Sequence, residues 1–193
     1  LVGSLVGGRA AFIVVNWEYF RQHLLEIFQV YQGGLSWPGA MAGGLVLVIL
    51  YAWRLGKPTG ELLWVLFPLL TSIVGVALLA CWLDGCAYGS LARGNFGLLT
   101  VDELDHRALR IPTQLIGILA AVLWYAGLDS QKERFSRLAP AGWVSILGMA
   151  LIMFGLALLR VDPGLYAYGM RLDAWAALIF TAFALVGVLG SRR

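Results

Sequence analysis

The stretch from Leu62 to Leu83 contains no charged side chain. A helix of about 20 apolar residues is long enough to cross the hydrocarbon core of a bilayer. Lipid offers no partner to a free backbone N–H or C=O group, so the stretch must form a helix unless strands close into a barrel. Barrel strands would alternate apolar and polar residues, and this alternation is absent. The stretch therefore predicts a membrane-spanning helix.

Further apolar stretches with few charges predict further spans. They are Leu1–Trp17, Gly39–Trp53, Ile111–Leu128, Gly142–Leu159 and Ala174–Gly190. We therefore expect an all-α integral membrane protein, a bundle of about six transmembrane helices, with residues 1–193 forming a single transmembrane domain.

The composition agrees with this fold class. Hydrophobic residues make up 60% of the chain and charged residues 13%, and a soluble domain of this size could not bury so much apolar surface. Two cysteines are too few for a disulfide framework or a four-ligand metal site. The net charge of +3 comes without an internal basic run. We expect no nucleic-acid partner, no metal and no cofactor.

The segment Glu18–Trp37 separates the first two spans. Its apolar residues recur at helical spacing, which predicts an amphipathic helix in the membrane interface that ends at Gly33 and Gly34. Short basic loops are cytoplasmic as a rule, which places residues 54–57 and 132–137 inside, together with both ends of the chain. The interfacial helix and the polar stretch Asp84–Arg110 then face outward.

A few polar residues fall inside or beside the spans. Arg9 needs a partner within the membrane, which is a lipid phosphate or helix carbonyls, unless the span starts later and the side chain snorkels to the interface. Gln114 points an amide into the membrane near its outer face. Cys81 and Cys86 are five residues apart and do not share a helical face well, so inert cysteines are the simpler interpretation. His23 and Glu26 are more typical of a solvated surface than of a metal site.

Taken in order, the motifs resemble those of the bacterial prolipoprotein diacylglyceryl transferase family over most of the chain. The resemblance rests on Gly7-Gly8-Arg9, on His23 to Trp37, on Asp84-Gly85-Cys86-Ala87-Tyr88-Gly89, on Pro112-Thr113-Gln114-Leu115 and on Leu159-Arg160-Val161-Asp162. The family moves a diacylglyceryl group from phosphatidylglycerol to a lipoprotein cysteine, at the outer face of the cytoplasmic membrane. The resemblance therefore implies a multi-pass protein of the bacterial inner membrane.

The sequence departs from the family pattern at its ionisable positions. The histidine of the H-G-G motif corresponds to Pro38, and the signature arginine, asparagine and glutamate correspond to Leu78, Cys81 and Cys86. The later arginine and glutamate correspond to Met153 and Ala157, and the tyrosine and glutamate after P-T-Q-L to Ile116 and Gly117. The family's first span, with its tyrosine, is not found ahead of Leu1, so we expect a shortened N-terminus.

These substitutions predict a chain without transferase activity, since a lost base or phosphate clamp typically costs about 10²–10³-fold each. We expect no catalytic residue and a lipid-binding accessory subunit of a membrane complex. A phosphatidylglycerol-like phospholipid would contact five residues: Arg9, Asp84, Gly89, Gln114 and Arg160. The alternative is an active transferase with a rebuilt site, in which Cys81 or Cys86 is the nucleophile.

Overall fold

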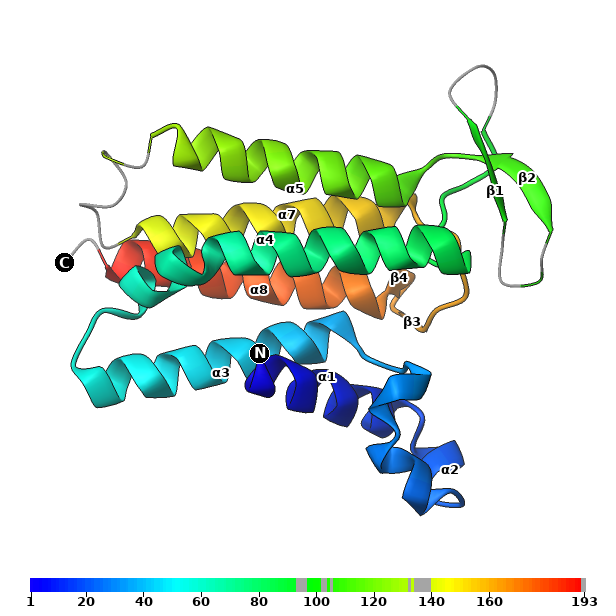
Figure 1. Ribbon diagram of the computed structural model, residues 1–193, viewed down its shortest axis with the longest axis horizontal. Coiled ribbons are helices and arrows are strands. Elements are labelled where there is room, and N and C mark those ends of the chain that lie inside the picture. Colours follow the sequence, from blue (N-terminus) through cyan, green and yellow to red (C-terminus); the bar gives the residue numbers. More distant parts are fainter. Residues whose placement is uncertain (93–96, 102–103, 105, 132, 134–139, 192–193) are drawn as a thin grey trace. The chain divides into compact units, whose positions relative to one another are not determined.

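The computed structural model describes residues 1–92, 97–101, 104, 106–131, 133 and 140–191. The chain forms two compact units, Leu1–Thr59 and Gly60–Arg193. Every predicted span is a helix in the structure, which confirms the all-α class (Figure 1). Among the described helices, α3, α4, α7 and α8 have the length and apolar composition to cross a membrane, while α1 and α5 are shorter apolar helices.

The first unit is built on an antiparallel pair of helices, α1 (Val2–Val15) and α3 (Trp37–Leu55). Glycines let the two backbones approach closely. A Cβ atom added to Gly7 would lie 2.4 Å from the carbonyl oxygen of Gly39. A Cβ atom on Gly43 would likewise meet the backbone of Gly3. Small residues at such a seam are typical of helix association in membranes.

The connection between α1 and α3 corrects one prediction. In place of a continuous amphipathic helix over Glu18–Trp37, it forms α2 (Trp17–Phe20), η1 (Leu24–Phe28) and η2 (Val30–Gln32). Glycines with positive φ angles of 90° and 79° at positions 33 and 34 then lead into α3. The physical reason is that backbone carbonyls of this segment bind the Arg9 side chain. We call residues 17–36 the arm.

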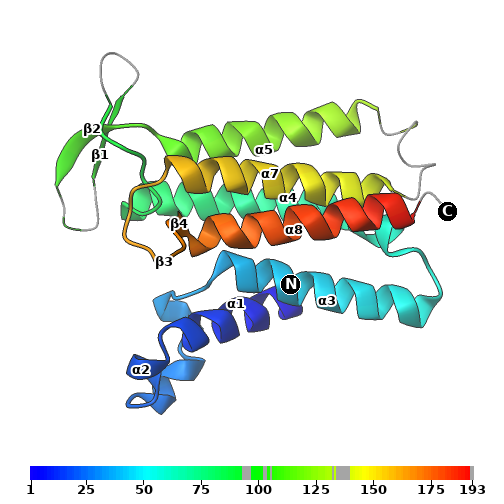
Figure 2. The same cartoon turned by 180° about the vertical axis from the view of Figure 1, so that it is seen from behind.

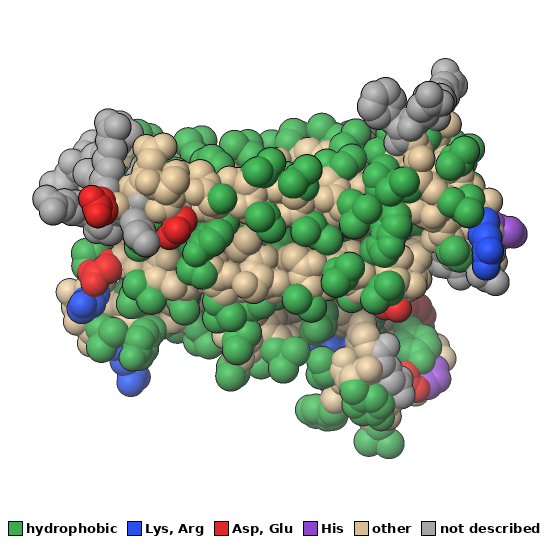
Figure 3. Space-filling model, turned by 45° about the horizontal axis from the view of Figure 1, so that its top comes forward, with side chains coloured by type: hydrophobic (Ala, Val, Ile, Leu, Met, Phe, Trp, Pro, Cys, Tyr) green, Lys and Arg blue, Asp and Glu red, His purple; other side chains and the backbone are tan. Residues whose placement is uncertain are grey.

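In the second unit, four long helices run side by side (Figures 1 and 2). They are α4 (Thr59–Asp84), α5 (Thr113–Asp129), α7 (Ala141–Leu159) and α8 (Leu172–Gly190). Phe67, Ala121, Leu128 and Met149 form a buried core between α4, α5 and α7. On the visible face, hydrophobic side chains cover the helices and charged side chains gather toward their ends (Figure 3). This is the surface expected of helices in lipid.

Two short hairpins, which the sequence analysis did not predict, lie at one end of these helices (Figure 1). In the first, β1 (Leu98–Val101) pairs with β2 (Arg107–Arg110), and Leu99 faces Leu109. In the second, β3 (Tyr166–Ala167) pairs with β4 (Met170–Arg171). The predicted basic loop at residues 132–137 lies outside the described residues, apart from Glu133. The single-domain interpretation of residues 1–193 stays a prediction.

Candidate functional site

Three connections of the second unit meet at the end that carries the hairpins. They are the loop after α4, the junction between β2 and α5, and the connection from α7 to α8. Gly89 joins them: its N–H donates to the carbonyl of Ile111 over 3.2 Å, and it forms an antiparallel bridge with Arg160. A Cβ atom at Gly89 would lie 2.6 Å from the Ile111 oxygen. A glycine is therefore required where these segments cross.

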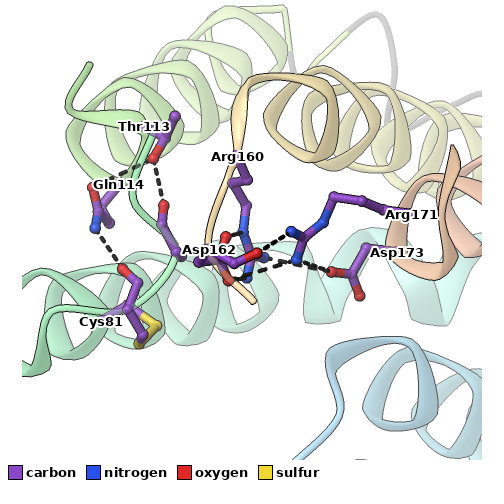
Figure 4. Close-up of a disulfide and its surroundings, with 9 residues drawn as sticks. Cys81, Thr113, Gln114, Arg160, Asp162, Arg171 and Asp173 are labelled. Carbon is purple, nitrogen blue, oxygen red and sulfur yellow. Dashed lines mark hydrogen bonds and ion pairs between the residues drawn. A yellow bond between two sulfur atoms is a disulfide. The ribbon is translucent and has the colours of Figure 1, made fainter. Parts of the chain in front are cut away.

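The start of α5 holds the loop after α4 in place. Gln114 is 2% exposed, and its Nε2 donates to the carbonyl of Cys86 over 2.5 Å. The hydroxyl of Thr113 donates to the carbonyl of Ala87, a residue with a positive φ of 58° (Figure 4). A backbone in this strained region needs such support. The predicted polar group at Gln114 is therefore buried, and its amide holds the loop.

Two arginines and two aspartates form an ionic cluster beside this loop (Figure 4). Arg160 binds the carboxylate of Asp162 through Nε at 2.9 Å and Nη2 at 2.6 Å. Arg171 donates to the backbone carbonyl of Asp162 at 2.6 Å and to Asp173 Oδ2 at 3.2 Å. Burial lowers the pKa of the Arg171 guanidinium, but Asp162 and Asp173 outweigh this effect and raise the pKa above its ordinary value. Arg171 therefore stays charged.

Arg171 was not predicted as a site residue, because a basic residue beside a predicted span has the sequence signature of an ordinary membrane-border residue. The available signal was its spacing from Asp173 at the start of a helix, where a carboxylate is favourable. Asp84, the fourth predicted site residue of this unit, lies exposed at the end of α4. The structure thus gathers Gly89, Gln114 and Arg160 into one group of connections, with Asp84 at its border.

Arg9 lies in the first unit and is 8% exposed. Its Nε donates to the carbonyl of Ile27 at 2.9 Å, and its Nη1 donates to the carbonyls of Gly33 and Gly34 at 2.8 and 3.2 Å. Its Nη2 donates to the carbonyl of Glu26. The guanidinium also lies 5.2 Å from the centre of the Phe20 ring. Carbonyls of the short helix η1 and of Gly33 and Gly34, all in the arm, are therefore the protein partners of this buried charge.

His23 and Glu26 each contact Tyr19. Nδ1 of His23 lies 3.1 Å from the Tyr19 carbonyl, and the Tyr19 hydroxyl donates to Oε2 of Glu26 at 2.6 Å. This hydrogen bond raises the pKa of Tyr19 above its ordinary value. Within the described ranges, no group of three or more His, Cys, Asp or Glu side chains is arranged to hold a metal ion.

Cys81 and Cys86 form a disulfide, with their Cα atoms 4.6 Å apart. The sequence did not predict this bond, because the two residues do not share a helical face, and the structure joins them for a geometric reason. The helix α4 ends at Asp84, and Gly85 has a φ of +72°, which turns the chain back toward the preceding turn. The Cys86 N–H then donates to the Cys81 carbonyl at 2.9 Å. Neither sulfur is a free thiol in this structure.

Three positions that depart from the transferase pattern, one each in α4, α7 and α5, are Leu78, Ala157 and Gly117. Leu78 is buried at 9% exposure, and Ala157 at 4%. A Cβ atom on Gly117 would lie 2.6 Å from a methyl group of Leu156 and 2.8 Å from one of Leu78. The atoms nearest to an added Cβ at Gly117 therefore all belong to leucine side chains.

Comparisons with known proteins agree with the motifs. The family model described as prolipoprotein diacylglyceryl transferase matches residues 1–189. A phosphatidylglycerol–prolipoprotein diacylglyceryl transferase of Streptococcus agalactiae is 23% identical over 197 residues, which cover 98% of this chain and 76% of the relative. A namesake from Aromatoleum aromaticum is 25% identical over 100% of this chain and 75% of the relative. One from Rhodospirillum centenum is 28% identical over 81% of this chain and 57% of the relative. The chain therefore belongs to the prolipoprotein diacylglyceryl transferase family of bacterial inner-membrane proteins.

Proposed function

We propose that this chain is a non-catalytic member of its family, which binds a phosphatidylglycerol-like phospholipid and acts as an accessory subunit of a membrane complex. The observation that carries the proposal is the apolar packing around Leu78, Gly117 and Leu156. The family resemblance implies ionisable groups at Leu78 and at Ala157. Leucine and alanine can neither accept a proton nor bind a phosphate, so acid–base chemistry has no group there.

The disulfide supports the same conclusion at two other positions. The resemblance implies an asparagine at Cys81 and a glutamate at Cys86. As partners in a disulfide, these residues provide neither a general base nor a nucleophilic thiolate. Each lost group typically costs about 10²-fold or more, and losses within one site do not multiply in full, so we expect the substitutions at Leu78, Cys86, Met153 and Ala157 together to lower a transfer rate by at least about 10⁴-fold.

Lipid binding is proposed for the group of connections at the hairpin end of the second unit. Arg160 binds Asp162 through Nε and Nη2, while its Nη1 lies 3.8 Å from Asp173, beyond hydrogen-bond length. Nη1 is therefore the atom that we assign to a lipid phosphate. The exposed carboxylate of Asp84 would accept hydrogen bonds from headgroup hydroxyls.

The other predicted site residues would act on the lipid indirectly. Gln114 holds the loop that leads to Gly89, and Gly89 leaves room for the crossing segments. Arg9 holds the arm through its carbonyl contacts. The lipid contact predicted for Arg9 itself stays a prediction.

A transfer assay tests the proposal. The purified chain is incubated with phosphatidylglycerol and a lipoprotein signal peptide, beside the Streptococcus agalactiae relative as positive control. We expect no diacylglyceryl peptide from this chain, and robust turnover would contradict the proposal. Purification in mild detergent tests the accessory role, for which we expect co-purifying membrane subunits. A monodisperse lone chain would count against that role.

The second candidate is an active diacylglyceryl transferase with a rebuilt site. It is favoured by the relatives, each of which is named as a transferase. In this case Cys81 or Cys86 would be the nucleophile after reduction of the disulfide. Product formation that is abolished by Cys81→Ala or Cys86→Ala would establish this candidate. Product that persists in both variants would show that neither cysteine is the nucleophile.

A further inference from the structure

The ionic cluster has two guanidinium groups directed at a single carboxylate oxygen. Oδ2 of Asp173 lies 3.2 Å from Nη2 of Arg171 and 3.8 Å from Nη1 of Arg160 (Figure 4). The two arginines lie at opposite ends of the connection from α7 to α8: Arg160 follows the end of α7, and Arg171 precedes the start of α8. One guanidinium lies within hydrogen-bond distance of this oxygen and the other lies 3.8 Å from it, so the two planar groups are close enough to contact one tetrahedral phosphate.

The two carboxylates of the cluster have different surroundings. The Asp162 side chain is 5% exposed, and its carboxylate contacts both arginines, with Oδ2 2.6 Å from Arg160 and 3.5 Å from Arg171. The Asp173 side chain is 26% exposed, the largest exposure of the four side chains. Asp162 is therefore a fixed inner partner, whereas Asp173 occupies the side of the cluster that an incoming anion would reach.

Arg171 has hydrogen-bonding capacity that the described residues do not use. Its side chain is 5% exposed, and its Nε–H is buried without a hydrogen-bond partner among the described residues. A buried N–H without a partner is rare in folded proteins and calls for an explanation. A bound phosphate has enough acceptor oxygens for Arg160 and Arg171 at once. Asp173 also stands in the first turn of α8, where the helix dipole favours an anion.

We propose that Arg160 and Arg171 form a binding site for a phosphate group, and that the carboxylate of Asp173 occupies this site when no phosphate is bound. The inference deepens the proposed lipid binding and rests on it: it adds Arg171 as a phosphate ligand and Asp173 as an internal competitor. The ligand chemistry is a phosphate, carried by a phospholipid headgroup or free in solution.

A purely structural role for the cluster makes a different prediction for Asp173. If the cluster only joins α7 to α8, Asp173→Asn removes an ion-pair partner and leaves phospholipid binding unchanged. If Asp173 competes with phosphate, Asp173→Asn increases phosphate binding. The competing pair is partly exposed, so its removal should tighten phosphate binding by up to about fivefold.

Native mass spectrometry of the full chain provides the test. The wild type, Asp173→Asn and the double variant Asp173→Asn with Arg171→Gln are incubated in detergent with phosphatidylglycerol, with phosphatidylcholine or with inorganic phosphate alone. Asp129→Asn is the matched control, because Asp129 is exposed at the C-terminal end of α5. Thermal melting without ligand is measured in parallel, so that binding is compared only between folded proteins.

We expect Asp173→Asn to retain more of both lipids than the wild type and the Asp129→Asn control, and the double variant to lose this gain. Equal retention by the wild type and Asp173→Asn, or a gain that survives Arg171→Gln, would overturn the inference. A gain with inorganic phosphate alone would support the anion site but assign it to a soluble phosphate. Turnover by the wild type in the transfer assay would refute the proposed absence of catalysis and leave this result standing.

Discussion

Replacement of Arg9 by methionine should release the arm from α1. The guanidinium donates to the carbonyls of Glu26, Ile27, Gly33 and Gly34. Hydrogen bonds from a charged group contribute about 1.5–3 kcal/mol each, but they share one side chain and do not add. Loss of the buried arginine removes the hydrogen-bond donor to all four carbonyls, so we expect the arm to be destabilised by about 3–5 kcal/mol.

Amide hydrogen exchange measures this local stability. Within the arm, the N–H groups of Glu26, Gln29 and Gly33 are hydrogen-bonded to carbonyls of the arm, so their exchange reports whether its turns are formed. A loss of about 3 kcal/mol corresponds to exchange that is faster by about a hundredfold, measured by mass spectrometry in lipid nanodiscs. Peptides from α4 and α7 should exchange as in the wild type.

Arg21→Met is the matched control. Arg21 is also an arginine of this unit, but its ion pair with Glu18 is exposed, with side-chain exposures of 52% and 78%. Such pairs contribute about 0–1 kcal/mol. If Arg9→Met and Arg21→Met leave the exchange of the arm equally unchanged, then the carbonyl contacts of Arg9 do not hold the arm, and this interpretation of its role is wrong.

Three further predictions concern the first unit and the disulfide. Gly43→Val should destabilise the α1–α3 pair by several kcal/mol in thermal melts, since even a Cβ atom would lie 2.1 Å from a carbonyl oxygen of α1. Gly75→Ala is the control and should have little effect, because nothing lies within 4 Å of an added Cβ atom there. Glu26→Gln should lower the pKa of Tyr19 in a spectrophotometric titration, because the hydrogen bond to Glu26 raises this pKa in the folded chain. The stabilisation from this hydrogen bond is fully present below the unfolded pKa of about 10, and it is lost as the pH rises through the folded pKa. An unchanged titration curve would contradict the hydrogen bond between Tyr19 and Glu26. Folded protein from an oxidising preparation should react with a thiol reagent only after reduction, and labelling without reductant would contradict the disulfide.

The helical spans could be predicted because their cause is local to each stretch. Charge-free length alone identified α4, and the structure begins and ends this helix within a few residues of the predicted Leu62–Leu83. The arm could not be predicted in the same way. Its apolar spacing fits a helix, but a buried arginine, distant in sequence, binds its carbonyls and breaks the helix into short turns.

The candidate site could be predicted only in part for a similar reason. Motif order identified Gly89, Gln114 and Arg160, and the structure brings their segments together. The contacts of Arg171 and the disulfide depend on how the chain turns after α4 and after α7. The turn at Gly85 has a local cause, because glycine readily adopts the positive φ angle that the turn needs. The sequence does not show which earlier residue the chain contacts after this turn.

A single-turnover transfer assay tests most directly whether this chain keeps the family scaffold without the chemistry. The chain is placed in excess over a labelled lipoprotein signal peptide in phosphatidylglycerol vesicles, so that even slow transfer produces labelled product. We predict a rate at least about 10⁴-fold below that of the Streptococcus agalactiae relative and equal to that of protein-free vesicles. A rate within about a hundredfold of the relative would mean that other groups carry the reaction, and it would contradict the conclusion that this chain is non-catalytic.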